Sequence, residues 1–317
     1  MKRALAIALA AGLLAACHGG AASIGPRATT PAASGTATAA TSPTGGPSLS
    51  ATPSPAAQTP TSATATPAGA SDPFTLALRL RYPTPDALAA ALANAETAIR
   101  SGGATPAALA DLGRAQDAAY HQLAEQPEWR AGMLAQLPER LRPIAQANLD
   151  AGDELKALDH PRDTLPAWRI LAPLPESELK ADYLEAQRLS GIPWQYLAAI
   201  NLVESRMGRI RGLSAGGAEG PMQFIPATWA YYGRGDVNNP HDAILAAGHF
   251  LADHGGPADM ARALYGYNPS PHYVRAITIY AQQIQAEPRA LDGYYNWQVY
   301  FGTLTRGDAL LTVGFGA

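Results

Sequence analysis

The chain has 317 residues, a formal net charge of −3 and a charged fraction of 15%. This length is enough for about two ordinary domains. Nucleic-acid binding requires a clustered basic face, and a chain with a net charge of −3 gives no sign of one. We therefore expect no nucleic-acid partner. A neutral polymer recognised by hydrogen bonds and stacking is compatible with this composition.

Residues 1–16 have the pattern of an export signal peptide. Lys2 and Arg3 precede an apolar run that ends at Ala16, and this run is shorter than the about 20 residues that span a bilayer. The run leads into Leu14-Ala15-Ala16-Cys17, which resembles the lipobox of bacterial lipoproteins. The resemblance implies cleavage before Cys17, lipidation of its thiol, and a chain anchored on the cell membrane facing the cell wall. A plain signal peptide with an incidental cysteine is the alternative.

Residues 17–73 are predicted to form the lipidated cysteine and a long disordered tether. Between Gly19 and Ser71 the chain is almost wholly Ala, Thr, Ser, Pro and Gly, and Arg27 is its only charge. Such a segment cannot bury enough apolar surface to offset its ordering entropy. As a flexible coil it would span about 40 Å. Because Cys17 is the only cysteine, internal disulfides are excluded.

Residues 74–164 are predicted to be a small helical region. Apolar residues at helical spacing run from Leu88 to Ile99 and stop at Ser101-Gly102-Gly103. A second helix begins at Pro106, and a third crosses Leu134–Ile144 with limits blurred by two prolines. We expect this region to pack on the following domain or to position it.

Residues 165–292 are predicted to be a second helical domain, so the fold class is mainly α. The expected helices are 176–190, one that begins near Pro193, 226–232, 241–254, 257–265 and 270–285. Beyond them, Trp297, Val299 and Phe301 alternate with polar residues, and Thr305–Asp308 has turn chemistry. Residues 293–317 are therefore predicted to be a C-terminal β-hairpin extension.

A carboxylate interrupts the apolar stripe of the helix that begins near Pro193. Leu197, Ile200, Glu204 and Met207 are predicted to share one face, before Gly208 and Gly212 end the helix. No cation lies three or four residues from Glu204. Burial without a counter-charge should raise its pKa and let it act as a proton donor. A solvent-facing glutamate at a helix end is the alternative.

Three ordered motifs resemble the soluble lytic transglycosylase family. They are Glu204-Ser205, then Ser214–Gln223 (SAGGAEGPMQ), then Tyr267-Asn268, with a new helix expected to begin within Gly220–Phe224. Pro221 stands where the family usually has leucine. The resemblance spans about residues 175–285. It implies that the domain 165–292 is catalytic, with a goose-lysozyme-like helical fold, and cleaves the glycan strands of peptidoglycan.

The resemblance also implies a mechanism and a set of site residues. Glu204 would act first as acid and then as base, giving 1,6-anhydro products without water. The substrate would be held by Ser214, Met222, Gln223, Tyr267 and Asn268. We expect no cofactor, and a monomer whose partners are glycan strands and, through the lipid, the membrane. A hydrolytic muramidase and a non-catalytic peptidoglycan-binding lipoprotein are the alternatives.

Other polar residues fit structural roles from their positions. No second carboxylate stands out among Glu219, Asp236, Asp242 and Asp253. Asp236 and Asp242 are at predicted turn and helix-start positions, where capping explains them. The group His249, Asp253 and His254 and the segment that begins at Asp236 do not match a metal site, so none is predicted. Four aromatic residues could stack on sugars, although core packing is the ordinary role of such residues: Trp229, Tyr231, Tyr232 and Tyr265.

Overall fold

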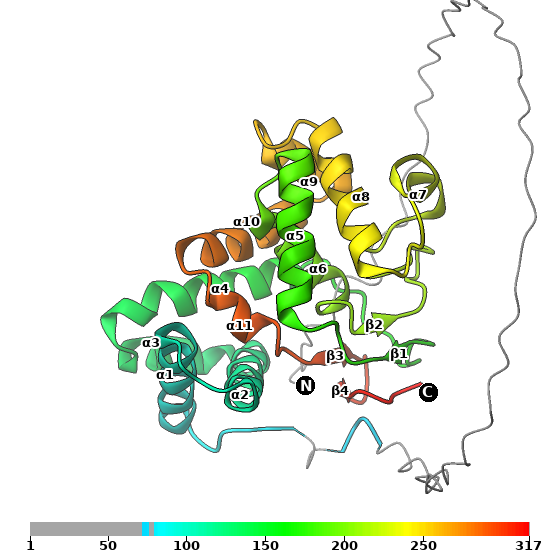
Figure 1. Cartoon of the computed structure of the whole chain (residues 1–317). Coiled ribbons are helices and arrows are strands. Elements are labelled where there is room, and N and C mark those ends of the chain that lie inside the picture. Colours follow the sequence, from blue (N-terminus) through cyan, green and yellow to red (C-terminus); the bar gives the residue numbers. More distant parts are fainter. Residues whose placement is uncertain (1–71, 76–78, 317) are drawn as a thin grey trace, which may run out of the picture. The chain divides into compact units, whose positions relative to one another are not determined.

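A computed structural model of the chain describes residues 72–75 and 79–316. The predicted signal peptide 1–16, Cys17 and nearly all of the tether 17–73 lie outside these residues. The described part is mainly helical, as predicted, with two small two-stranded sheets (Figure 1). Within that part, no helix is both long enough and apolar enough to cross a membrane.

The described residues of the N-terminal helical region form four α-helices and two short 3₁₀ helices. Thr84 and Thr105 cap the first two, because each hydroxyl accepts a hydrogen bond from the backbone N–H three residues later. The third predicted helix is divided, since Pro138 separates α3 from η3. The bounds are α1 Pro85–Ser101, α2 Pro106–Glu125, η2 Pro127–Trp129, α3 Arg130–Gln136, η3 Glu139–Leu141 and α4 Arg142–Lys156.

Seven further α-helices follow in the described chain. Six correspond to predicted helices, and α11 was not predicted because five residues are too few to show a helical period. The bounds are α5 Glu176–Ser190, α6 Trp194–Ser205, α7 Pro226–Tyr232, α8 Pro240–Asp253, α9 Met260–Tyr267, α10 Pro271–Ala286 and α11 Ala290–Tyr294.

One hydrophobic cluster runs through both helical parts of the chain, from Leu88 in α1 to Trp297. Helix α10 packs against α4 and α6, and α5 packs against α6 and against α8, beside which it lies in Figure 1. The boundary near residue 165 therefore separates segments whose side chains share a core. Its assignment as a domain boundary stays a prediction.

The predicted C-terminal hairpin is confirmed. Strands β3 (Val299–Gly302) and β4 (Asp308–Leu311) pair antiparallel, with Gly302 opposite Asp308. The turn both begins and ends earlier than the predicted Thr305–Asp308, because β3 ends at Gly302 and Asp308 already belongs to β4. The Thr303 hydroxyl closes this turn by donating to the Gly307 carbonyl at 2.6 Å.

The hairpin packs against a second small sheet that was not predicted. Strands β1 (Arg169–Ile170) and β2 (Ile210–Arg211) pair antiparallel, and each is too short to show alternation in the sequence. Residues of both sheets form a second apolar cluster: Trp168, Ile170, Ile210, Val299, Phe301, Ala309 and Leu311.

Two predictions around the glutamate helix are wrong in detail. Helix α6 ends at Ser205, because Arg206 and Met207 take positive φ angles of 51° and 60°. Met207 is thus buried in the core but does not lie on the helix with Glu204. No helix begins within Gly220–Phe224 either, since Gln223 also has a positive φ and its N–H closes a turn onto the Gly220 carbonyl.

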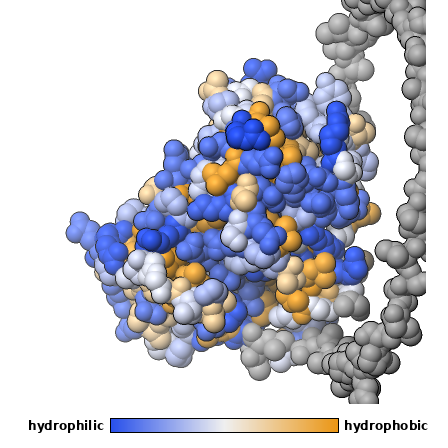
Figure 2. Space-filling view, viewed as in Figure 1, coloured by the Kyte–Doolittle hydropathy of each residue, from blue (hydrophilic) through white to orange (hydrophobic). Residues whose placement is uncertain are grey.

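The surface in Figure 2 is mostly hydrophilic, with small apolar patches between polar side chains. Leu184 and Leu189 on α5 are exposed, and single exposed apolar residues are normal on the surface of a folded protein. We assign them no role.

Two glycines of the loop between α6 and α7 give a matched test of its packing. Gly217 and Gly220 both have a φ of +79°, but a Cβ at Gly220 would lie 2.0 Å from the Val237 carbonyl oxygen, whereas a Cβ at Gly217 meets nothing within 4 Å. Gly217→Ala should cost about 1–2 kcal/mol of unfolding free energy. Gly220→Ala should cost clearly more, measured by urea denaturation. Equal losses would contradict this packing.

Candidate active site

Glu204 lies in the last turn of α6 with its side chain directed into the protein. Every residue from Leu197 to Ser205 is buried, and Glu204 itself is only 5% exposed. The Tyr273 hydroxyl, from α10, donates a hydrogen bond of 2.7 Å to Glu204 Oε1. Packing of α6 against α10 therefore places a tyrosine on the buried carboxyl group.

The environment of Glu204 favours its protonated form, as the sequence predicted. Burial raises the pKa of Glu204 to about 8, and the hydrogen bond from Tyr273 opposes this shift. A carboxyl group with such a pKa is largely neutral at pH 7. It can therefore donate a proton to a leaving oxygen and afterwards accept one.

A hydrogen-bonded junction ties the glycine-rich loop to the helix end that carries Glu204. The Ser205 hydroxyl donates to the Pro221 carbonyl at 2.6 Å, and Asn201 Nδ2 donates to the same carbonyl at 2.8 Å. The Gly208 N–H in turn donates to Ser205 Oγ at 2.9 Å. These bonds hold the two left-handed residues after Ser205 and bring the Met-Gln end of the loop to Glu204's helix.

Tyr267 fastens the same loop from α9. Its hydroxyl donates to the Met222 carbonyl at 2.5 Å, and its ring stacks parallel to that of Tyr273 at a centroid distance of 6.4 Å. Burial and the charge of Glu204 both raise the pKa of Tyr267 well above its usual value. Glu204, Tyr267 and Tyr273 thus form one group of side chains drawn from three helices.

The remaining predicted site residues have local contacts of their own. Gln223 is 4% exposed and its Nε2 donates to the Gly220 carbonyl at 2.8 Å. Met222 lies fully in the core, and Asn268 is buried directly after Tyr267 at the end of α9. The Tyr267–Met222 bond joins the segment of Met222 and Gln223 to Tyr267, whose pKa the charge of Glu204 helps to raise. Their roles in substrate binding stay predictions.

Ser214 makes its hydrogen bonds within its own loop. Its hydroxyl accepts a hydrogen bond from the Ala218 N–H at 2.9 Å, and its backbone pairs with the same residue. These contacts are those of a turn-forming serine. A substrate contact by Ser214 would have to be made in addition to them.

The other carboxylates occupy local structural positions. Glu219 Oε1 accepts a 2.6 Å bond from Asn238 Nδ2, and the Asp236 N–H donates to Asp242 Oδ2 at 3.0 Å. Asp253 ends α8. Burial raises the pKa of Tyr232, and the charge of Asp253 and the hydrogen bond that its carboxylate accepts from the Tyr232 hydroxyl add to this shift. These contacts agree with the turn and helix-start positions predicted for Asp236 and Asp242.

Tyr273 is the site residue that sequence reasoning missed. It lies in the apolar stripe of α10, where an aromatic residue is expected to be part of the core, and it is fully buried. Its distance from Glu204 along the chain leaves no local pattern that pairs them. Only the packing of α10 on α6 makes it a contact of the carboxyl group.

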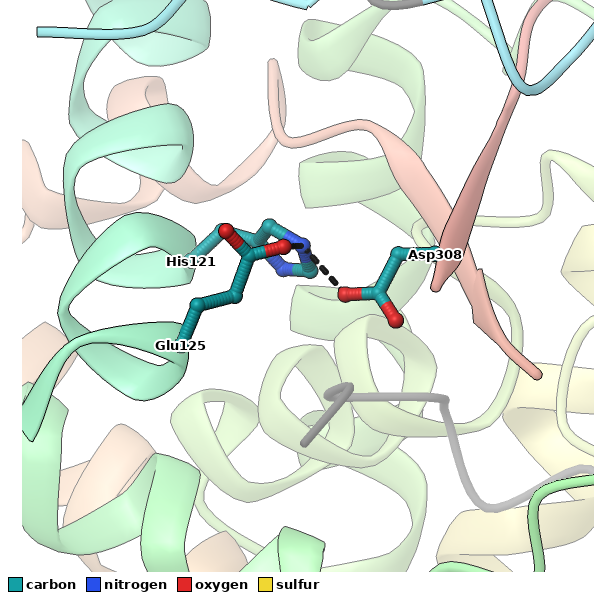
Figure 3. A group of neighbouring side chains, drawn as sticks. All are labelled: His121, Glu125 and Asp308. Carbon is teal, nitrogen blue, oxygen red and sulfur yellow. Dashed lines mark ion pairs between the residues drawn. The ribbon is translucent and has the colours of Figure 1, made fainter. Parts of the chain in front are cut away.

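A second buried charged cluster joins α2 to the C-terminal hairpin (Figure 3). His121 Nε2 lies 2.6 Å from Asp308 Oδ2 and 3.5 Å from Glu125 Oε1, and the Tyr300 ring stacks on the imidazole at 3.8 Å. Burial lowers the pKa of His121, but the contacts with Asp308 and Glu125 outweigh it and raise the pKa to about 9.

The three ligand-capable atoms of this cluster lie within 4.8 Å of one another, close enough to hold a metal ion. Two arginines already supply positive charge there, since Arg81 Nη1 lies 2.5 Å and Arg79 Nη1 3.7 Å from the carboxylate oxygens of Glu125. A divalent cation would add positive charge to a cluster in which two arginines and a protonated His121 already exceed the charge of the two carboxylates. We therefore assign the cluster to ion pairing.

Comparison with known proteins gives one partial similarity. No family model matches the chain, and no solved structure matches it. The membrane-bound lytic murein transglycosylase F of Thiobacillus denitrificans (strain ATCC 25259 / T1) is 37% identical over 75 residues. The match covers 24% of this chain and 16% of that relative. It suggests the lytic transglycosylase family over about a quarter of the chain, and a lysozyme-like fold stays a proposal.

The hydrogen bond from Tyr273 gives a direct test of the site's electrostatics. Tyr273→Phe removes the donor that favours the charged carboxylate, so the pKa of Glu204 should rise above its wild-type value of about 8. Titration of the Glu204 carboxyl carbon by NMR measures this. Tyr267→Phe, whose hydroxyl is bonded to the Met222 carbonyl, is the control and should shift the pKa less. A fall in pKa on Tyr273→Phe would contradict the geometry.

The His121 cluster predicts a pH-dependent contribution to stability. A histidine whose pKa is about 9 when folded and near 6.5 when unfolded stabilises fully below about pH 6.5, and this contribution disappears as the pH rises through 9. His121→Phe keeps a ring against Tyr300 but leaves Asp308 buried and unpaired. It should cost about 3 kcal/mol near pH 6, and less above about pH 9, in denaturant unfolding.

Added zinc distinguishes ion pairing from a metal site in the same cluster. We expect no rise in the melting temperature of the wild type on zinc addition. A zinc-dependent rise that His121→Phe abolishes would overturn the ion-pair assignment.

Proposed function

We propose that this chain is a peptidoglycan lytic transglycosylase that cleaves the β-1,4 bond between MurNAc and GlcNAc without water. The observation that carries the proposal is the buried Glu204, whose pKa of about 8 suits both proton donation and proton uptake near neutrality. The order of the three motifs and the partial similarity to a lytic murein transglycosylase support the substrate class.

In the proposed reaction one carboxyl group serves two steps. The Glu204 proton passes to the glycosidic oxygen as the C1–O bond breaks, and the leaving sugar departs with a hydroxyl group. The resulting Glu204 carboxylate then takes the proton of the C6 hydroxyl of the same MurNAc. The C6 oxygen closes onto C1, which gives the 1,6-anhydro end and restores the protonated acid.

The tyrosines would tune this cycle. Tyr273 donates to Oε1 at 2.7 Å, so it stabilises the carboxylate that exists between the two steps. Burial favours the neutral carboxyl group instead, so Glu204 is again protonated at the end of the cycle. Gln223, Met222, Tyr267, Asn268 and Ser214 are proposed to hold the strand beside the carboxyl group.

We further propose that the chain works from the outer face of the cell membrane. The lipobox-like sequence that ends at Cys17 supports a lipid anchor, and the Pro- and Thr-rich segment after it supports a tether that lets the catalytic part reach wall polymer. The relative's description as membrane-bound agrees with this location.

The central residue predicts a single-site loss of activity. Glu204→Gln keeps shape and hydrogen bonding but cannot cycle a proton, so turnover of purified sacculi should fall by about 10²–10⁴-fold or more. Mass spectrometry of the soluble muropeptides from the wild type should show 1,6-anhydro ends.

Conservative replacements of the other carboxylates serve as controls for the Glu204 variant. Glu219→Gln, Asp236→Asn, Asp242→Asn and Asp253→Asn should each stay within about tenfold of the wild type, well short of the loss expected for a general acid–base residue. Reducing-end products, together with one of these carboxylates as indispensable as Glu204, would instead identify a two-carboxylate muramidase. Intact strand binding with no cleavage by the wild type would identify a binding lipoprotein.

The anchor predicts a change of location. Cys17→Ala removes the thiol that would carry the lipid, so the exported protein should move from the membrane fraction to the soluble fraction. Fractionation with immunoblotting measures this, and unchanged membrane association and processing would rule the lipobox out.

A further inference from the structure

Aromatic rings form a connected network from the Glu204 site to helix α7. Tyr267, beside Glu204, contacts Phe224 at a centroid distance of 5.9 Å and Phe250 at 5.2 Å. Phe224 contacts Trp229 of α7 at 5.6 Å, and Phe250 contacts Tyr232 of α7 at 5.1 Å. Two separate paths of ring contacts therefore hold α7 beside the site.

Helix α7 has an unusual composition for its exposure. Its sequence, Pro-Ala-Thr-Trp-Ala-Tyr-Tyr, carries no charge, three of its seven residues are aromatic, and none is buried. Trp229 has a packing role, because its ring lies against the backbone of Gly233, where an added Cβ would come within 2.2 Å. Tyr232 has a packing role against Phe250. Tyr231, the third aromatic residue, is much more exposed.

Tyr231 is 70% exposed, and its ring contacts that of Tyr232 at 4.7 Å. Arg234, the nearest following cation, turns its guanidinium back onto the carbonyls of Gly233 and Tyr231 at 2.7 and 3.5 Å. An aromatic surface thus continues outward from the ring network, with the Asp253 carboxylate at the Tyr232 hydroxyl and the Arg234 guanidinium held on backbone carbonyls. Such a surface suits the C–H face of a neutral sugar ring better than an anionic polymer.

We propose that Tyr231 stacks on a sugar ring of the glycan strand outside the bond that is cleaved, with α7 as the surface that holds the strand. The inference rests on the proposed function, which supplies the glycan. The two paths from Tyr267 make α7 continuous with the Glu204 site, and four further rings separate Tyr231 from that carboxyl group. Tyr231 is therefore a binding residue and takes no part in proton transfer.

The test measures binding in a background that cannot cleave. In the Glu204→Gln protein, adding Tyr231→Ala should raise the Kd for purified peptidoglycan strands about tenfold, or about 1.4 kcal/mol. Tyr231→Trp keeps an aromatic face and should bind within about threefold of Glu204→Gln alone, a difference below 1 kcal/mol. Leu304→Ala is the matched control, because Leu304 is 68% exposed on the β3–β4 turn and should leave the Kd unchanged.

A second readout separates this inference from the proposed function. In the otherwise wild-type enzyme, Tyr231→Ala should raise KM for sacculi and leave kcat nearly unchanged. If the wild type releases anhydro products and Tyr231→Ala changes neither Kd nor KM, the inference fails alone. If the wild type releases none, the proposed function fails. Loss of binding to anionic phospholipid vesicles, with strand binding intact, would reassign Tyr231 to a membrane surface and overturn the inference.

Discussion

The hydrogen bond between Tyr273 and Glu204, made inside the protein where α10 packs on α6, is the interaction on which the account depends. Burial alone would raise the pKa of the carboxyl group and make proton loss costly, while a solvated carboxylate would hold no proton near neutrality. The tyrosine hydroxyl at 2.7 Å provides the opposing effect without adding a charge. The carboxyl group is thereby poised between its two protonation states, which is what a residue that both donates and accepts a proton requires.

The rest of the described fold keeps this contact in place. Ser205 and Asn201 both bind the Pro221 carbonyl, so the loop that carries Met222 and Gln223 is joined to the helix end that carries Glu204. Tyr267 closes the arrangement from α9 through the Met222 carbonyl. The His121–Asp308 ion pair joins the C-terminal hairpin to α2. Residues of α2 and α10 belong to the same hydrophobic cluster.

Much of this could be predicted from the sequence, and the exceptions have physical causes. Helix α5 and helix α7 have the predicted bounds, because prolines, glycines and a clear apolar period mark them. The early end of α6 was not predicted because Arg206 and Met207 take left-handed conformations, which their N–H bonds to Leu202 and Asn201 and the Ser205–Pro221 contact accompany. The burial of Glu204 was predicted from its neighbours, whereas Tyr273 and the His121 cluster are long-range contacts with no local signal.

The most direct test of the central claim is the pKa of Glu204 in the wild-type protein. The carboxyl carbon of Glu204 can be followed by NMR in protein labelled at glutamate side chains, with the signal assigned by its absence in Glu204→Gln. We expect a midpoint of about 8, with the carboxyl group largely protonated at neutral pH. A midpoint near the ordinary glutamate value of about 4.3 would contradict it, because Glu204 would then have no proton to donate under working conditions.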